Sequence, residues 1–302
     1  MNSDKDPFVD FLRSRKGCTI YLKPYSGNAG DQLIWMGSKI LLNELGLKRI
    51  LNPQKADIIL WPGGNPTMWR RNLTGWLDCW KRWPHAEFVV GPAEFKGNDE
   101  PWQMMLTTTR AKVGALFARD PESYQNLRNL NMPKSVQVGL GNDAAFHLKD
   151  TKWIADIRET CLSEYILASF REDHESVMLR QKHNRLHEIW PFSSISWRFK
   201  HHQKKRFHFK RLGMVKKTAQ SSLPLIVEDV SMMSFYSFVE YVSRADQVHT
   251  DRLHCMIMAL LLGKEVFAYP TRYDKLEGVY EHSIKAWATV NFVDALGDFI
   301  PR

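Results

Sequence analysis

Residues 247–263 read Gln-Val-His-Thr-Asp-Arg-Leu-His-Cys-Met-Ile-Met-Ala-Leu-Leu-Leu-Gly. A short strand-like run, Gln247–His249, leads through a polar joint, Thr250–His254, into an apolar helical run that continues to Gly263. A strand followed at once by a helix is the unit from which α/β proteins are built. In an open α/β sheet, ligands usually bind where the carboxyl end of a strand meets the next helix. The stretch therefore indicates both a fold class and a candidate site.

The polar joint carries a carboxylate, a guanidinium and an imidazole, from Asp251, Arg252 and His254. The N–H groups of a helix start favour anions, and imidazole titrates near neutral pH, so the joint is suited to holding an anion and moving a proton. The alternative is a helix capped by Thr250 with solvated charges in its first turn, although an arginine there opposes the helix dipole. In a regular helix Arg252 and His254 would point roughly 200° apart. They converge only if the joint stays irregular past Arg252.

Most of the chain alternates short apolar runs with longer amphipathic runs, which predicts parallel strands joined by helical crossovers. The predicted strands are Thr19–Leu22, Asp57–Trp61, Glu87–Val90, Gly114–Ala118, Ser135–Val138, Tyr165–Phe170, Leu223–Val227, Gln247–His249 and Glu265–Tyr269. The predicted helices are Asp31–Leu45, Thr67–Trp80, Pro101–Ala111, Pro121–Leu130, Thr151–Leu162, Ser231–Arg244, one from Asp251 and one from Tyr273. We therefore predict an α/β fold of two Rossmann-like, doubly wound lobes facing a cleft. They cover residues 1–149 and 150–302, with a basic insertion around 180–222.

The composition is that of an ordinary globular protein, with 302 residues, 44% of them hydrophobic and 25% charged. The longest uncharged apolar run, Cys255–Gly263, has nine residues, whereas a membrane span needs ~20. The first residues lack the basic and apolar regions of a signal peptide. Four scattered cysteines match neither a metal-binding pattern nor a disulfide framework. We expect a reduced, cytoplasmic protein without a metal.

The net charge of +9 is concentrated in residues 197–217, which contain nine Lys and Arg and no acid, interleaved with aromatic residues. A basic segment with aromatic residues suits an anionic membrane surface. A solvated insertion loop explains it equally well. No zinc-finger spacing or aromatic RNA-binding signature accompanies the segment, so we expect no nucleic-acid partner.

Polar and glycine-rich motifs follow several predicted strands, where they would line a common edge of each sheet. The candidate residues are Asn28, Gly30 and Asp31 after the first strand, Gly63 and Gly64 after the second, and Arg119, Asp143 and Arg171 after later strands. Each motif alone has a structural explanation, such as a capped turn or a buried Arg–Asp pair. Together with Arg252 they indicate an anionic substrate, because arginine binds carboxylate and phosphate groups through two N–H donors at once.

The same motifs, taken in order along the chain, resemble the polysaccharide pyruvyl transferase family. The resemblance spans residues 18–282 and rests on Gly27-Asn28-Ala29-Gly30-Asp31, Gly63-Gly64, Ala118-Arg119-Asp120 with Ser123, Asp143-Ala144-Ala145-Phe146, Thr250-Asp251-Arg252-Leu253-His254 and Tyr273-Asp274-Lys275. Two departures stand out. Asn65 occupies a position where the family often has a third glycine, and residues 180–222 show no family pattern.

The resemblance implies a two-lobed GT-B fold with an acceptor-side N-terminal lobe and a donor-side C-terminal lobe. It also implies transfer of a pyruvyl group from phosphoenolpyruvate onto two hydroxyls of a saccharide, with no further cofactor. In that reaction His254 is expected to be the general acid and Asp31 the base or acceptor ligand. Arg252 and Arg119 would hold the donor's anionic groups, and Lys275 would add a phosphate contact. Analogy with the family also suggests an exopolysaccharide or cell-surface acceptor, lipid-linked at the inner face of the plasma membrane.

Two other functions are compatible with the sequence. A GT-B glycosyltransferase with a nucleotide-sugar donor would share the fold and the cations, and it differs in releasing a nucleotide rather than phosphate. A non-catalytic protein that binds membranes or polymers would work through residues 197–217.

Overall fold

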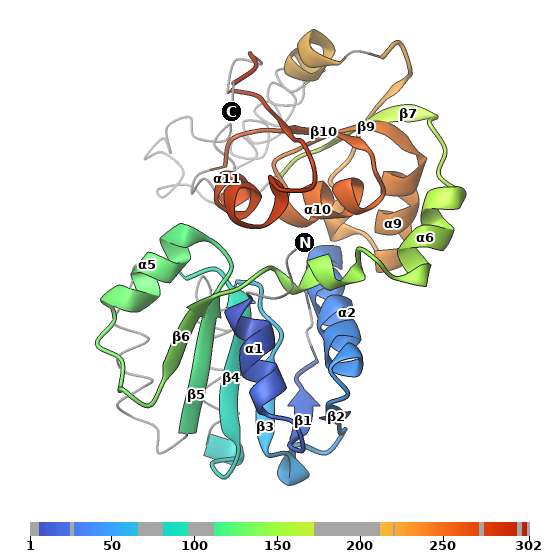
Figure 1. Cartoon of the computed structure of the whole chain (residues 1–302). Helices are drawn as coiled ribbons and strands as arrows, with labels where there is room; N and C mark the ends of the chain where they lie inside the picture. The colour runs from blue at the N-terminus through green and yellow to red at the C-terminus, as the bar shows by residue number, and fades with distance from the viewer. Residues whose placement is uncertain are drawn as a thin grey trace, which may run out of the picture. The chain divides into compact units, whose positions relative to one another are not determined.

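The computed structural model describes residues 6–24, 27–65, 81–95, 112–171, 212–219, 221–271, 275–294 and 298–300. The chain divides into two units (Figure 1). The first unit comprises Met1–Ala155 and Glu277–Ala288, and the second comprises Asp156–Leu276 and Thr289–Arg302. The predicted helices Thr67–Trp80 and Pro101–Ala111 lie outside the described residues, as do residues 197–211 of the basic segment.

The first unit contains a six-stranded parallel sheet with the order β2-β1-β3-β4-β5-β6. Its strands are β1 (Thr19–Leu22), β2 (Lys48–Arg49), β3 (Ile58–Trp61), β4 (Glu87–Ala93), β5 (Lys112–Ala118) and β6 (Gln137–Leu140). Its described α-helices before residue 156 are α1 (Pro7–Ser14), α2 (Ala29–Glu44) and α5 (Pro121–Asn129), followed by α6 (Lys152–Glu159) at the boundary with the second unit.

Both faces of the first sheet are covered, as expected for a doubly wound fold. Ile58 and Leu60 of β3 pack with α1 and α2 in one apolar cluster, whereas Ile59 packs with α5 in another. Successive side chains of a strand point to opposite faces, so this alternation places a hydrophobic core on each side of the sheet. Phe117 of β5 lies at the centre of the α1 side, with its ring centroid 5.2 Å from that of Phe8.

The second unit contains a five-stranded parallel sheet with the order β11-β10-β9-β7-β8. Its strands are β7 (Tyr165–Ser169), β8 (Leu225–Val227), β9 (Ala245–Thr250), β10 (Glu265–Ala268) and β11 (Asn291–Phe292). The helices α9 (Phe235–Arg244) and α10 (Leu253–Leu261) belong to this unit, and α11 (Lys275–Val279) begins in it. On one face of the sheet, Phe267 packs with Met214 and Val215 of a helix over residues 212–218.

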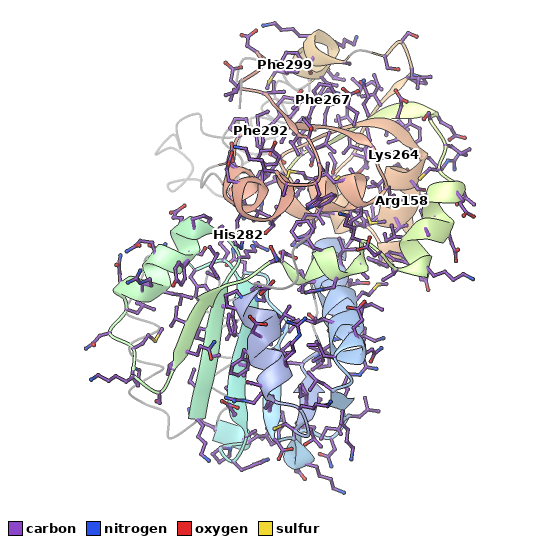
Figure 2. All side chains as sticks on the ribbon, in the orientation of Figure 1. Arg158, Lys264, Phe267, His282, Phe292 and Phe299 are labelled. Atoms are coloured by element: carbon purple, nitrogen blue, oxygen red, sulfur yellow. The ribbon has the colours of Figure 1, made fainter. Side chains whose placement is uncertain are left out.

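Basic side chains tie the ends of neighbouring elements together in the second unit. Arg158 of α6 donates from Nε to the carbonyl of Leu261 at 2.6 Å, and Lys264 donates from Nζ to the carbonyl of Leu162 at 2.8 Å (Figure 2). A cation at a helix C-terminus is stabilised by the helix dipole. Arg158 therefore fixes the end of α10, the helix that follows the polar joint.

The two sheets share one strand order, and this order defines a switch point in each of them. Numbered along its own part of the chain, the first sheet runs 2-1-3-4-5-6 and the second runs 2-1-3-4-5, the order of flavodoxin-like folds. In the first sheet the direction of winding reverses between β1 and β3, and in the second between β7 and β9. Ligands of open α/β sheets bind outside the carboxyl ends of the strands at such a point.

The predicted class, two Rossmann-like α/β units with parallel sheets, is confirmed. Most differences concern element ends: β4 continues through Gly91 and Pro92 to Ala93, and α10 starts at Leu253 rather than Asp251. The sequence did not predict α1 or the short strands β2 and β11. After α11 a π-helical turn, Tyr280–Ile284, belongs to the first unit. In the part of the chain that the structure describes, no helix is long and apolar enough to cross a membrane.

Candidate functional site

We call the carboxyl ends of β1 and β3 the first switch point; it comprises Lys23, Asn28–Asp31 and Trp61–Asn65. Its helix, α2, starts with a capping box. Asn28 Oδ1 accepts from the N–H groups of Gly30 at 2.9 Å and Asp31 at 3.3 Å, and Asp31 Oδ2 accepts from the N–H of Asn28 at 3.1 Å. The predicted site residues Asn28 and Asp31 therefore hold each other and fix the start of the helix.

The Gly63–Gly64 turn follows β3 in a conformation that favours glycine. The φ angles are +130° and +89°, and a Cβ at Gly63 would lie 2.4 Å from the carbonyl oxygen of Pro92. The indole N–H of Trp61 donates to the carbonyl of Gly63 at 3.0 Å. On the other side, Gly64 pairs with Ala93, and its carbonyl accepts from the N–H of Glu94 at 2.8 Å. The backbone thus passes close to the end of β4 in a geometry that only glycine adopts easily.

Arg119 lies in a buried network of carboxylates beside this turn. Its Nη1 donates to Asp143 Oδ2 at 3.0 Å and its Nη2 donates to Glu94 Oε2 at 3.4 Å, and all three side chains are at most 3% exposed. Glu94 Oε2 also accepts from Asn65 Nδ2 at 3.0 Å. Burial alone would lower the pKa of Arg119. The nearby carboxylates, above all Asp143, outweigh this effect and raise the pKa above its ordinary value, so the guanidinium stays charged.

The structure therefore joins two predicted substrate ligands, Arg119 and Asp143, to each other. The sequence did not single out their third partner, Glu94. The available signal was an acidic residue directly after a strand. It was missed because Gly91 and Pro92 suggested that the strand had already ended.

The second switch point, at the carboxyl ends of β7 and β9, comprises Ser169–Arg171 and Thr250–His254. Thr250 Oγ1 donates to the carbonyl of Ser169 at 2.6 Å and accepts from the N–H of Arg252 at 2.9 Å. Asp251 Oδ1 accepts from the N–H of Arg171 at 2.7 Å. These bonds fasten the polar joint across both strands of the switch point.

Thr250 is not the cap of the helix. Arg252 is the N-cap residue, with φ −99° and ψ 115°, and α10 begins at Leu253. The joint is thus extended through Arg252, as convergence with His254 requires. His254 is half-buried in the first turn, Arg171 is half-buried, and Lys275, at the start of α11, is buried.

The guanidinium of Arg252 binds a carboxylate from the loop after β8. Arg252 Nε donates to Asp229 Oδ1 at 3.1 Å, Nη2 donates to Asp229 Oδ2, and the two side chains are 8% and 13% exposed. Asp229 was also missed from the sequence, although it follows a predicted strand. Its carboxylate fixes the plane and direction of the Arg252 side chain.

His249, the other histidine near the joint, belongs to the core. Its ring stacks on Phe267 with centroids 4.3 Å apart, and Nδ1 lies 3.0 Å from the hydroxyl of Tyr269. Burial lowers the pKa of His249 to about 3, so the ring is neutral at physiological pH. This position suits packing rather than proton transfer.

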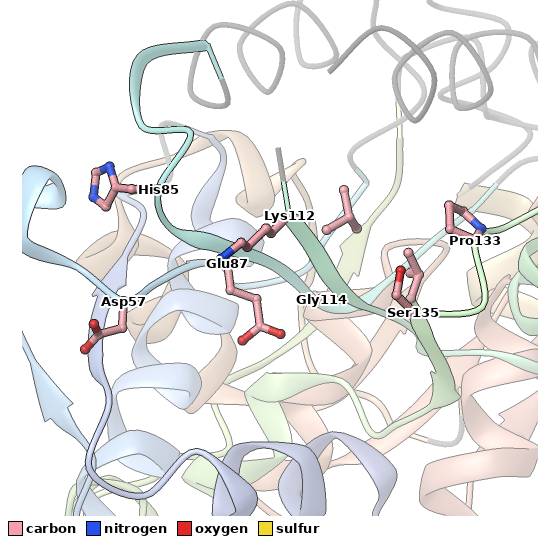
Figure 3. A pocket seen from close by; sticks show the side chains of 9 residues that line it. Asp57, His85, Glu87, Lys112, Gly114, Pro133 and Ser135 are labelled. Atoms are coloured by element: carbon pink, nitrogen blue, oxygen red, sulfur yellow. The ribbon is translucent and has the colours of Figure 1, made fainter. Parts of the chain in front are cut away.

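A separate hollow of about 600 Å³ lies at the amino ends of the strands of the first sheet (Figure 3). Its lining includes Asp57 and Glu87. Asp57 accepts from the N–H and hydroxyl of Thr19, both at 2.7 Å, and Glu87 forms a two-pronged ion pair with Arg15. Both carboxylates thus have structural partners, and the hollow is at the edge opposite the switch point. Among the described residues no group of His, Cys, Asp and Glu could hold a metal ion.

Two Rossmann-like units, each with polar and charged residues at its switch point, define an α/β protein of the doubly wound class. A family model for polysaccharide pyruvyl transferase matches residues 28–273, and the chain belongs to this family. As a member it is a transferase that places pyruvyl groups on polysaccharide. The match includes both switch points except Lys23. No curated protein matches the chain significantly.

Solved structures resemble the fold at low sequence identity. A functionally uncharacterized protein from Klebsiella pneumoniae is 20% identical, with a TM-score of 0.62 over 95% of this chain and 96% of that chain. The UDP-GlcNAc 2-epimerase of Methanocaldococcus jannaschii is 11% identical, with a TM-score of 0.42 over 92% and 88% of the two chains. HepE from Anabaena, solved with UDP and glucose, is 11% identical, with a TM-score of 0.42 over 91% and 84%.

Proposed function

We propose that this transferase uses phosphoenolpyruvate as its donor and forms a cyclic pyruvate ketal on two hydroxyls of a saccharide. Carbon C3 of the donor gains a proton and becomes a methyl group, while C2 forms bonds to both sugar oxygens and loses its bond to the phosphate oxygen. The two sugar hydroxyls lose two protons in total. One ends on the new methyl group and the other on the released phosphate. The donor has a carboxylate and a phosphate, so its site needs fixed cations but no redox group.

The observation that carries the proposal is the placement of the chemistry-bearing motifs. The Thr250–His254 joint lies at the second switch point. The capping box of α2 and the Gly63–Gly64 turn lie at the first switch point. Open α/β sheets bind their ligands at these points because several loops converge there on helix starts. The motifs that define the family are therefore located where the fold favours ligand binding.

In the second unit, we propose that Arg252 binds an anionic group of the donor and that His254 is the general acid. Asp229 binds the edge of the Arg252 guanidinium formed by Nε and Nη2, which fixes the position of the side chain. An arginine that is held rigidly loses little side-chain entropy on binding, which favours affinity. His254 is two residues further on, in the first turn of α10, where a bound donor would receive a proton at C3.

In the first unit, we propose that Asp31 binds the acceptor hydroxyls or acts as the base, with Asn28 and Gly30 maintaining the turn. Arg119 and Asp143 have a different role from the one the sequence suggested. Because they are buried and bound to each other, we propose that they do not touch the donor. They instead stabilise the Gly63–Asn65 turn through Glu94, which binds both Arg119 and Asn65.

The decisive experiment incubates the full-length protein with phosphoenolpyruvate and a panel of free and lipid-linked saccharides. Formation of a ketal methyl group is followed by NMR, and phosphate release is followed by colorimetry. Nucleotide release from a sugar nucleotide, without a ketal, would identify a glycosyltransferase instead.

Two variants test the assigned roles. We expect His254→Ala to abolish turnover and leave the Kd for phosphoenolpyruvate nearly unchanged, and Arg252→Ala to raise that Kd at least tenfold. The control is His85→Ala, an exposed histidine at the amino ends of the strands of the first sheet. Near-normal kcat in His254→Ala would disprove the acid assignment.

We also propose that the acceptor is an exopolysaccharide or cell-surface glycan carried on a lipid, and that residues 197–217 contact the anionic membrane. Met214 and Val215 are core residues of the second unit, so deletion of the whole segment would damage the fold. Neutralising the Lys and Arg residues between 198 and 211 is the better test. We expect weaker binding to anionic vesicles and unchanged activity on a free saccharide.

A further inference from the structure

The two arginines that the sequence assigns to the donor both have carboxylate partners. Arg119 is bound by Asp143 and Glu94, and Arg252 is bound by Asp229. In the first unit, Arg119 follows β5 rather than β1 or β3, so neither arginine supplies a cation to the first switch point. The start of α2 does not replace it, because the capping box occupies the N–H groups of Gly30 and Asp31.

Lys23, which the sequence did not single out, is the first residue beyond β1 at this switch point. Its N–H donates to the carbonyl of Leu60 at 2.9 Å, so its backbone is fixed on the seam between β1 and β3. Its side chain is half-buried, and Nζ lies 4.1 Å from the ring centroid of Trp61. Among the described residues, no carboxylate lies within ion-pair distance of Lys23.

Trp61 gives this lysine a fixed position. The face of its ring attracts the ammonium group, and the ring is itself held by the bond from Nε1 to the carbonyl of Gly63. A cation over an aromatic face keeps its N–H donors available on the side away from the ring. Lys23, Trp61 and the Gly63–Gly64 turn thus form one connected unit that presents a positive charge.

We propose that Lys23 binds the carboxylate or phosphate group of a substrate at the first switch point, with Trp61 holding its ammonium in place. This assignment rests on the proposed function and replaces Arg119 as the anion-binding cation of the first unit. The anion belongs either to phosphoenolpyruvate or to a phosphorylated saccharide acceptor. Both present the same chemistry to a lysine.

The test measures binding by calorimetry with the full-length protein and three probes: inorganic phosphate, phosphoenolpyruvate and glucose 1-phosphate. Loss of a hydrogen bond to a charged group corresponds to roughly a tenfold to hundredfold change in Kd. We expect Lys23→Gln to weaken at least one probe by that factor, and Trp61→Leu to weaken the same probe by a smaller factor. An effect on phosphoenolpyruvate alone identifies the donor, and an effect on glucose 1-phosphate alone identifies the acceptor.

Lys39→Gln is a matched control, because Lys39 Nζ also lies over a tryptophan, 4.5 Å from the ring centroid of Trp35, but along α2 and away from the switch point. It removes the same charge and the same type of contact, and we expect unchanged Kd values. Circular dichroism melting checks that each variant is folded.

The outcomes separate this inference from the proposed function. Equal Kd values for all probes in Lys23→Gln and wild type, or no binding of any probe by wild type, overturn the role of Lys23. If a probe binds in a way that depends on Lys23 but no saccharide yields a ketal product, the proposed reaction is wrong and the anion-binding role of Lys23 is supported.

Discussion

Asp229 accepts hydrogen bonds from two nitrogens of Arg252, Nε and Nη2, in a side-on ion pair that is mostly buried. The two residues come from different loops, after β8 and after β9. The pair therefore joins an edge strand of the second sheet to the polar joint at its switch point.

Removing the charge of Asp229 tests how strongly this pair stabilises the fold. We expect Asp229→Asn to lower the free energy of unfolding by about 3 kcal/mol, because a buried guanidinium loses its counter-charge. Urea unfolding gives the value. The control is Asp10→Asn, whose partner Arg13 is 45% exposed, and there the loss should stay below about 1 kcal/mol. Equal losses in the two variants would contradict a structural role for the buried pair.

Arg119→Met removes the cation from two buried carboxylates, Asp143 and Glu94. We expect a loss of roughly 3–5 kcal/mol in the free energy of unfolding at neutral pH. Without the cation, burial raises the pKa of each carboxyl above its unfolded value, so the deficit should shrink as the pH falls from the raised folded pKa toward the unfolded values near 4. Urea unfolding at pH 7 and pH 5 measures both effects. A loss that is independent of pH would argue against the charge network.

Gly63→Ala tests the turn at the first switch point. At φ +130° a side chain is strained, and its Cβ would lie 2.4 Å from the carbonyl oxygen of Pro92, so we expect a loss of roughly 3 kcal/mol. Gly46→Ala provides the comparison, because Gly46 also has a positive φ, +64°, but nothing lies within 4 Å of its Cβ position. Its loss should be about 1 kcal/mol. Thermal melting of both variants gives the ranking, and the reverse order would refute the close approach at Gly63.

His249→Phe tests the buried neutral histidine. Its folded pKa of about 3 lies below the unfolded value of 6.5, so the unfolded chain takes up a proton first as the pH falls. The stability that His249 contributes is fully present above pH ~6.5 and is lost between pH ~6.5 and ~3, at up to ~1.4 kcal/mol per pH unit. The phenylalanine variant should lose less stability than wild type between pH 6 and pH 4. The exposed His85→Gln control should follow wild type, and identical slopes in all three proteins would exclude the proposed pKa.

The sequence predicts the strands and their order in the chain well, because local patterns determine them. The strand Thr19–Leu22 was predicted with the observed ends. Helix starts were predicted within a few residues where a capping residue and a proline coincide, as at Asp120 and Pro121. The same signal, Asp6 before Pro7, precedes α1, which was nevertheless missed because the helix has only eight residues.

The candidate site was predictable in its positions but not in its partners. The candidate residues were expected after strands, and there the structure has them: some lie at the switch points, whereas Arg119 and Asp143 follow β5 and β6. The carboxylates that bind the arginines come from other loops: Glu94 is 25 residues before Arg119, and Asp229 is 23 before Arg252. Such residues come together only because of the order of the strands in the sheet, and a local sequence pattern does not predict that order. Lys23 was overlooked for the same reason, because its significance comes from Trp61 on the neighbouring strand.

The return of residues 277–288 to the first unit affects how this enzyme can be dissected. A stop after residue 155 would remove the ring of Trp287, which lies over Lys149 at 4.3 Å and meets Phe146 edge-on at 5.9 Å. A fragment made that way would expose an apolar surface and aggregate. In chain order, residues 156–276 of the second unit are inserted between the two segments of the first unit, 1–155 and 277–288. Chimeras between family members should therefore exchange the inserted stretch together with the tail after residue 288, rather than join two halves at one point.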